Sequence, residues 1–218
     1  QYRIGMLYEE GEVIDKNPDE TFFWYSEALK NGPVLAESLA PWMFTYYAIH
    51  GRAANLENTA YWYSQIPFNK STKEVVKNLE ETLELAYYQA GLDYYYGVNV
   101  EKDILKAVHY IDKCNTQFED DLIDYELIGQ IKFELAMEYE LGTILDRHMD
   151  AAIHKYTESA EYGNIHSYCR LGMFLEEGDV VEQDLTKAVS MYSFAAERGQ
   201  AVAQFRLGRF YYEGVAVP

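Results

Sequence analysis

The stretch that decides the fold is Asp184-Leu-Thr-Lys-Ala-Val-Ser-Met-Tyr-Ser-Phe-Ala-Ala-Glu-Arg-Gly199, with the run Ala203-Gln-Phe-Arg-Leu-Gly-Arg-Phe-Tyr-Tyr-Glu-Gly-Val-Ala-Val-Pro218 after it. Apolar residues recur in both runs every three or four positions, which is the spacing of an amphipathic helix. Asp184 is a typical helix N-cap residue, and Gly199 marks the end of the first run. The two runs therefore predict two short helices separated by a tight turn.

The glycines of these runs repeat along the chain with a period of 36 residues. Gly172 lies 36 residues before Gly208, and Gly178 lies 36 residues before Gly214. The same interval of 36 residues relates a second set of positions to the first. Leu171, Gly178, Ala188, Tyr192, Ala196 and Gly199 are each preceded, 36 residues earlier, by an identical residue: Leu135, Gly142, Ala152, Tyr156, Ala160 and Gly163. A fixed period of this length is the signature of a repeat array.

We expect a single repeat domain of about five and a half αα-hairpin units. Their expected bounds are about 1–32, 33–67, 83–117, 127–163, 164–199 and 200–218, with a linker or extended helix at 68–82 and an exposed acidic insertion at 115–124. Since one hairpin cannot bury its apolar face alone, the units should stack into an all-α superhelical solenoid. The chain starts without Met and stops within the pattern, so we expect a fragment of a longer chain.

Glycine in the middle of a helix needs a packing reason, because it costs about 1 kcal/mol relative to alanine. Gly172 and Gly208 occupy such positions. We expect a partner helix to approach these glycines closely, with Ala188 or Ala196 facing it. The aromatic residues expected to fill the space between successive hairpins include Trp24, Tyr192 and Tyr211.

Charge excludes several partner classes. The chain has 18 Lys and Arg against 36 Asp and Glu, a formal net charge of −18. Because phosphate contacts need basic residues on one face, a nucleic-acid partner or an anionic membrane surface is not expected. No apolar run approaches the roughly 20 residues of a membrane span, so this segment should not insert into a membrane. The compartment stays open between the cytoplasm and an extracytoplasmic space such as the endoplasmic-reticulum lumen or the periplasm.

The sequence contains no recognisable catalytic pattern. It has no glycine-rich phosphate loop, nucleophile elbow, HExxH or CxxC motif. The five His are scattered, without a pair spaced for zinc on one helix face. Cys114 and Cys169 fall on different units and are expected to be small buried residues. We therefore expect no enzymatic activity, no cofactor and no metal site.

The runs at 184–199 and 203–218 resemble the Sel-one-like repeat family, a subclass of the tetratricopeptide-type helical repeats. The resemblance is strong over 127–218, good over 1–32 and 83–114, and degenerate over 33–82. It implies a solenoid whose first helices line a concave face that holds ligands. It also implies a role as an assembly platform, like the family's ubiquitin-ligase adaptors, chitin synthase regulators and bacterial envelope or host-interaction proteins.

In this register, aromatic, methionine and acidic side chains alternate along the concave face. The residues expected to line it are Tyr2, Met6, Glu9, Trp42, Tyr46, Tyr88, Leu92, Tyr95, Phe133, Met137, Glu140, Met173, Glu176, Phe205, Arg209 and Tyr212. Such a lining suits a protein or peptide with apolar anchors and several basic residues. The alternative for each aromatic residue is partial burial between units.

These observations favour a non-catalytic scaffold or adaptor that binds a partner on the concave face. Two alternatives stay open: a regulatory or substrate-docking region of a larger enzyme whose catalytic domain lies outside this segment, and a structural subunit of a large complex. The incomplete unit at 200–218 leaves an apolar face, so self-association through it is also expected.

Overall fold

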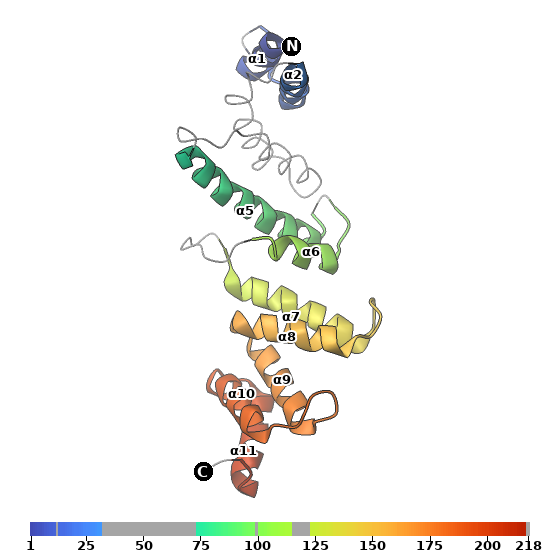
Figure 1. Ribbon diagram of the computed structural model, residues 1–218, viewed down its shortest axis with the longest axis vertical. Coiled ribbons are helices and arrows are strands. Elements are labelled where there is room, and N and C mark those ends of the chain that lie inside the picture. The colour runs from blue at the N-terminus through green and yellow to red at the C-terminus, as the bar shows by residue number, and fades with distance from the viewer. Residues whose placement is uncertain (12, 32–72, 99, 115–122, 217–218) are drawn as a thin grey trace. The chain divides into compact units, whose positions relative to one another are not determined.

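The computed structural model describes the chain except for residues 12, 32–72, 99, 115–122 and 217–218, and the described part contains helices and no strand (Figure 1). Contacts divide the chain into Gln1–Glu119 and Asp120–Pro218. We call these the N-terminal part and the C-terminal part.

Two helical hairpins make up the described residues of the N-terminal part. The pairs are α1 (Tyr2–Glu10) with α2 (Pro18–Asn31), and α5 (Lys73–Tyr96) with α6 (Ile104–Ile111). Asn17 caps the start of α2, because its Oδ1 accepts a hydrogen bond from the backbone N–H of Asp19 at 3.1 Å. α5 continues without a break from the expected 68–82 segment into the expected third unit. The expected second unit, 33–67, lies outside the described residues.

The C-terminal part is a succession of antiparallel helices. Its described helices are α7 (Tyr125–Leu141), α8 (Met149–Glu161), α9 (Ile165–Glu177), α10 (Leu185–Glu197) and α11 (Ala201–Glu213). Each of these helices packs against the next one in the chain. The predicted all-α fold of helical hairpins is confirmed, whereas the repeat count and the period stay predictions. Within the expected acidic insertion, Ile123 is buried and Asp124 caps α7.

The second helices begin at a repeated N-cap. Asp184 Oδ1 accepts a hydrogen bond from the backbone N–H of Lys187 at 2.9 Å. Asp103 Oδ1 likewise accepts one from the backbone N–H of Lys106 at 3.0 Å. His148 lies 36 residues before Asp184 and is the N-cap of α8. Its Nδ1 accepts a hydrogen bond from the backbone N–H of Ala151 at 3.3 Å, which is longer than the two bonds to aspartate. The same cap position thus carries a weaker acceptor in α8.

We expect His148→Asp to raise the free energy of unfolding by about 0.5–1 kcal/mol, because a carboxylate is a better N-cap and interacts favourably with the helix dipole. Urea unfolding at neutral pH measures the change. The reverse substitution, Asp184→His, should lower stability by a similar amount. A less stable His148→Asp variant would contradict the prediction.

A side chain packed directly on a glycine joins the two helices of a hairpin. A Cβ atom on Gly172 would lie 2.7 Å from Cε1 of Tyr192, which is fully buried. The N-terminal part repeats this arrangement with Gly5 under Tyr25 and Gly91 under Ile111. The glycines are therefore needed for the side chain above them.

Three expectations about this packing need correction. The expected close approach is absent at Gly208, where no neighbouring atom of the described residues lies within 4 Å of an added Cβ. The atoms nearest to Gly172 belong to the ring of Tyr192 and not to Ala188 or Ala196. Tyr211 is 57% exposed and does not fill the space between hairpins, because its neighbour Phe210 faces the core instead. Successive helical residues point about 100° apart, so only one of the two can face inward.

Gly172→Ala and Gly208→Ala should change stability in opposite directions. The first should lower the free energy of unfolding by about 1–2 kcal/mol, because overpacking against Tyr192 outweighs the gain in helix propensity. The second should raise it by up to about 1 kcal/mol, since among the described residues no heavy atom lies within 4 Å of an added Cβ at Gly208. Urea unfolding of both variants is the measurement. Equal shifts of the same sign would contradict this account.

Candidate functional site

The structure distributes the expected groove residues over α1, α5, α7, α9 and α11, while Trp42 and Tyr46 lie outside the described residues. Their exposure differs widely. Tyr88 is only 7% exposed, whereas Tyr212 is 92% exposed. In the C-terminal part, one cavity brings together Phe133, Met137, Glu140 and Met173.

The expected residues of the N-terminal part make contacts within their own hairpins. On α1, the ring of Tyr2 stacks on that of Tyr25, with 5.6 Å between centroids, and Glu9 accepts a hydrogen bond from the Tyr25 hydroxyl. Met6 and Leu92 are partly buried. Tyr95 lies beneath the ammonium group of Lys102, which is 5.2 Å from the ring centroid.

A recurring hydrogen bond joins the two helices of the C-terminal hairpins. Tyr156 Oη donates to Glu140 Oε2 at 2.7 Å, and Tyr192 Oη donates to Glu176 Oε2 at the same distance. Burial and the Glu176 carboxylate raise the pKa of Tyr192, so the hydroxyl keeps the proton that it donates. Each glutamate therefore faces the interior of its hairpin.

Arginines from the next first helix bind the same carboxylates. Arg170 Nε donates to Glu140 Oε2 at 2.9 Å, and Arg206 Nη1 donates to Glu176 Oε2 at 2.9 Å. Arg209 also pairs with Glu176. The side chains of Glu140 and Glu176 are only 11% and 10% exposed. These carboxylates are compensated within the chain, which removes the basis for expecting them to attract a basic partner.

The Glu176 cluster should make stability depend on pH. Burial alone would raise the pKa of Glu176, but the Tyr192 hydroxyl and the Arg206 and Arg209 guanidinium groups hold this pKa below its usual range. Because the folded-state pKa is depressed, the stabilisation is present above the unfolded pKa of about 4.3 and is lost as pH falls through the folded pKa.

We therefore expect Glu176→Gln to be less stable than wild type at neutral pH, with a difference that shrinks at roughly pH 3–4. Urea unfolding at both pH values measures the difference. The exposed acid Glu182 is a suitable control site, since Glu182→Gln should change stability little at either pH. A difference for Glu176→Gln that stays constant with pH would contradict the prediction.

The cavity that collects the expected residues lies between the first helices α7 and α9 and has a volume of about 310 Å³. It is lined by Phe133, Met137, Glu140, Leu141, Tyr156, His166, Cys169, Arg170, Met173 and Gln200. Apart from His166, Gln200 and the paired Glu140 and Arg170, these side chains are apolar or aromatic. We call this the inner cavity.

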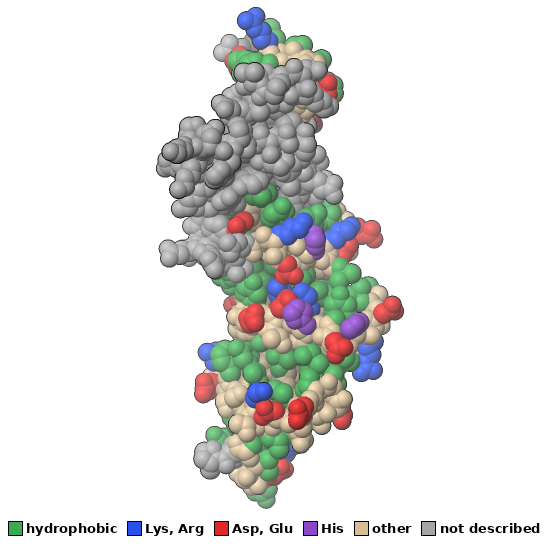
Figure 2. Space-filling model, viewed as in Figure 1, with side chains coloured by type: hydrophobic (Ala, Val, Ile, Leu, Met, Phe, Trp, Pro, Cys, Tyr) green, Lys and Arg blue, Asp and Glu red, His purple; other side chains and the backbone are tan. Residues whose placement is uncertain are grey.

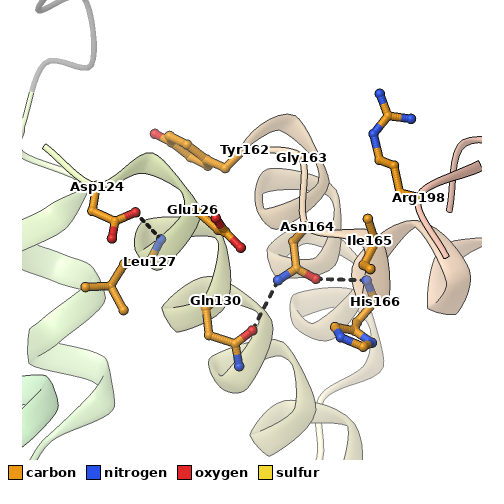
Figure 3. Close-up of a pocket in the computed structure, with 10 residues that line it drawn as sticks. All are labelled: Asp124, Glu126, Leu127, Gln130, Tyr162, Gly163, Asn164, Ile165, His166 and Arg198. Atoms are coloured by element: carbon orange, nitrogen blue, oxygen red, sulfur yellow. Dashed lines mark hydrogen bonds between the residues drawn. The ribbon is translucent and has the colours of Figure 1, made fainter. Parts of the chain in front are cut away.

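A second cavity, of about 640 Å³, adjoins the first at His166, which lines both. Its lining is polar and comprises Asp124, Glu126, Leu127, Gln130, Tyr162, Gly163, Asn164, Ile165, His166 and Arg198. In Figure 3, Asp124 and Glu126 project from the start of α7, and Arg198 stands on the opposite side. Two of the lining residues are joined by a hydrogen bond, in which Asn164 Nδ2 donates to Gln130 Oε1 at 3.3 Å. We call this the outer cavity.

Residues of α7 and α9 line both cavities, and His166 lines the two of them; we call the two cavities together the α7–α9 groove. The α7 residues that line it are Glu126, Gln130, Phe133, Met137 and Leu141, spaced three or four residues apart. Such spacing places side chains on one face of a helix. On the face of the C-terminal part shown in Figure 2, hydrophobic side chains interleave with charged ones of both signs.

Four of the residues expected from the sequence line the inner cavity, namely Phe133, Met137, Glu140 and Met173, whereas no expected residue lines the outer cavity. Glu126 and Gln130 continue the stripe of Phe133 at helical spacing, so this signal was available in the sequence. Arg198, from the end of α10, carries no such signal, because only the packing of hairpins brings it to the outer cavity.

The described residues carry few other chemical features. Both cysteines, Cys114 and Cys169, are buried and free, as predicted. Within the described ranges, no group of three or more His, Cys, Asp or Glu is placed to hold a metal ion. None of the helices there combines the length and the apolarity that crossing a membrane requires.

Consecutive helical hairpins define an all-α helical-repeat protein: glycine contacts hold each hairpin together, and Glu–Tyr–Arg clusters join each of the C-terminal hairpins to the next first helix. The chain belongs to the Sel1 repeat family, whose model matches residues 1–33, 84–113, 165–200 and 201–218, together just over half of the chain. Repeats of this kind typically mediate protein–protein interactions. The expected unit at 127–163 is not among the matched segments, although it forms the hairpin α7–α8.

Solved structures with a similar fold are Sel1-type proteins from bacteria. A Sel1 repeat protein from Oxalobacter formigenes is 23% identical in sequence, and the two structures superpose with a TM-score of 0.45. The match covers 98% of this chain and 78% of the Oxalobacter chain. A protective antigen of uropathogenic Escherichia coli strains, described as displaying an SLR fold, is 20% identical with a TM-score of 0.42. That match covers 97% of this chain and 48% of the antigen. The comparison with curated proteins gives no significant match.

Proposed function

We propose that the protein is a non-catalytic scaffold or adaptor that binds a protein or peptide partner in the α7–α9 groove. The inner cavity carries the proposal, because it opens an apolar space of about 310 Å³ on the first helices. Met137 and Met173 are flexible apolar groups that adapt to different partner side chains. An apolar anchor desolvated in such a pocket supplies much of the energy of a protein interface.

Two other roles are compatible with the same fold. In a docking region of a larger enzyme, the groove would hold the substrate and residues outside 1–218 would perform the chemistry. In a structural subunit, the outer faces of the hairpins would make the essential contacts. The adaptor role is favoured because the groove offers an apolar cavity beside a polar one, which suits a chain segment.

The test compares Met137→Glu with the matched control Ile144→Glu in a quantitative cross-linking pull-down from the native source. Both residues are exposed and apolar, at 37% and 80%, but only Met137 lines the groove. A specific partner should be retained by wild type and Ile144→Glu and reduced about tenfold or more by Met137→Glu. Circular dichroism establishes that both variants are folded. Equal recovery by all three proteins would refute the adaptor proposal for this groove.

Self-association through 200–218 is a separate part of the proposal. α11 exposes large apolar side chains, with Phe205 at 71% and Tyr212 at 92%. Light scattering of the 218-residue chain should therefore give a mass above the monomer value at high protein concentration. Phe205→Ser should restore the monomer mass. A monomeric wild-type chain would contradict this part and leave the groove proposal untouched.

A further inference from the structure

We propose that the segment bound in the α7–α9 groove combines an apolar anchor, seated in the inner cavity, with a Lys or Arg that pairs with Glu126 in the outer cavity. This inference rests on the proposed function and identifies the chemistry of the partner. It also differs from the expectation drawn from the sequence, which assigned the basic residues of a partner to Glu9, Glu140 and Glu176.

The inner cavity selects an uncharged side chain. Its carboxylate, Glu140, already accepts hydrogen bonds from Tyr156 and Arg170. Inserting a second cation would place it beside the Arg170 guanidinium, and inserting an anion would compete with Glu140 for its donors. A charge buried without a partner is strongly unfavourable, whereas an apolar group gains from contact with Met137 and Met173.

The outer cavity selects a cation. Glu126 is exposed, and among the described residues it has no hydrogen bond or ion pair. Arg198 also lines this cavity, but its guanidinium group is engaged with Phe194: its carbon lies 3.6 Å from the ring centroid, and its Nη1 donates to the Phe194 carbonyl at 3.1 Å. Asp124 adds a second acidic group to the same cavity. The chain's net charge of −18 also favours the approach of a basic segment.

The length of the groove determines the spacing of the two contacts. Glu126 and Leu141 are about 22 Å apart along α7 at the α-helical rise of 1.5 Å per residue. An extended segment covers this distance with about seven residues. The centre of the inner cavity, near Phe133 and Met137, is about 14 Å from Glu126 by the same measure. The anchor and the basic residue should therefore be separated by about four positions.

The test is a phage-display selection from a library of random dodecapeptides. The immobilised proteins are the wild-type chain, the variant Glu126→Lys and the variant Asp150→Lys. Asp150 is a matched control because it is an exposed acid in the first turn of α8, as Glu126 is in the first turn of α7. Wild type should enrich peptides with an apolar residue about four positions from a Lys or Arg. Glu126→Lys should bind these peptides about tenfold more weakly and select Asp or Glu at the basic position. Asp150→Lys should behave like wild type.

The outcomes separate the inference from the proposed function. Suppose wild type selects peptides with an apolar anchor and no preferred cation, and Glu126→Lys binds them equally well. The inference is then overturned and the adaptor proposal stands. If no peptide is enriched, or if Met137→Glu binds the enriched peptides as tightly as wild type does, both fail. A reversal of the preferred charge in Glu126→Lys supports the inference, because a merely structural role of Glu126 would not reverse it.

Discussion

Tyr192→Ala should lower the stability of the α9–α10 hairpin by about 3–5 kcal/mol, the usual cost of removing a large buried ring. Tyr192 is fully buried, its ring covers Gly172, and its hydroxyl donates to Glu176 at 2.7 Å. The substitution removes the ring packing and the hydrogen bond together. Native-state hydrogen exchange of the α9 and α10 amides measures the loss locally, and urea unfolding measures it for the chain.

Two control variants separate these contributions. Tyr192→Phe keeps the ring and should cost only about 1 kcal/mol, because one hydrogen bond is lost while Glu176 keeps its arginines. Tyr211→Ala removes a ring that is 57% exposed and should change stability by less than about 1 kcal/mol. If Tyr192→Ala were as mild as Tyr211→Ala, the ring on Gly172 would not be the main contact within the hairpin.

Glu158→Ala should cost about 2–3 kcal/mol, because it removes a carboxylate that lies between two ammonium groups. Glu158 Oε2 is 2.8 Å from Nζ of both Lys132 and Lys155, and the Lys132 side chain is only 6% exposed. Burial alone would raise the pKa of Glu158, but the hydrogen bonds from the two lysines lower it. Without the carboxylate, the buried Lys132 ammonium loses a favourable contact and faces a second positive charge.

The control for this cluster is Lys132→Met, which replaces the buried cation with an apolar side chain of similar length. It should stay within about 1 kcal/mol of wild type, because Glu158 keeps Lys155 and the cost of burying a charge disappears. Urea unfolding of both variants gives the comparison. A larger loss for Lys132→Met than for Glu158→Ala would show that packing of the lysine stem, rather than charge, stabilises this contact.

Local signals made the helices predictable. The cap at Asp184 and the helix-ending glycine at Gly199, with φ of 88°, were recognised because capping depends on residues within one turn of the helix end. Gly172 was predicted to be a packing position because glycine in the middle of a helix needs a compensating contact, whereas the same prediction was wrong at Gly208. The identity of the group above Gly172 was not predicted, since Tyr192, Ala188 and Ala196 all lie on the second helix and only the packed hairpin chooses among them.

The candidate site was only partly predictable. Helical register placed Phe133, Met137, Glu140 and Met173 on the face that lines the inner cavity. Register does not report what a side chain on that face contacts, and Glu140 and Glu176 turned out to be paired with arginines 30 residues later. The outer cavity was missed because its walls come from the start of α7, the α8–α9 turn and the end of α10.

By itself, the sequence determined the class of this protein: helical hairpins with capped ends, recurring glycines, and membership of a repeat family. These features depend on contacts along one helix or between adjacent helices, which a period makes visible. Only the tertiary structure decided which acids are neutralised and which remain available, as the contrast between Glu176 and Glu126 shows. Charge pairing depends on distances of a few ångströms between different hairpins, and residue spacing along the chain does not specify such distances.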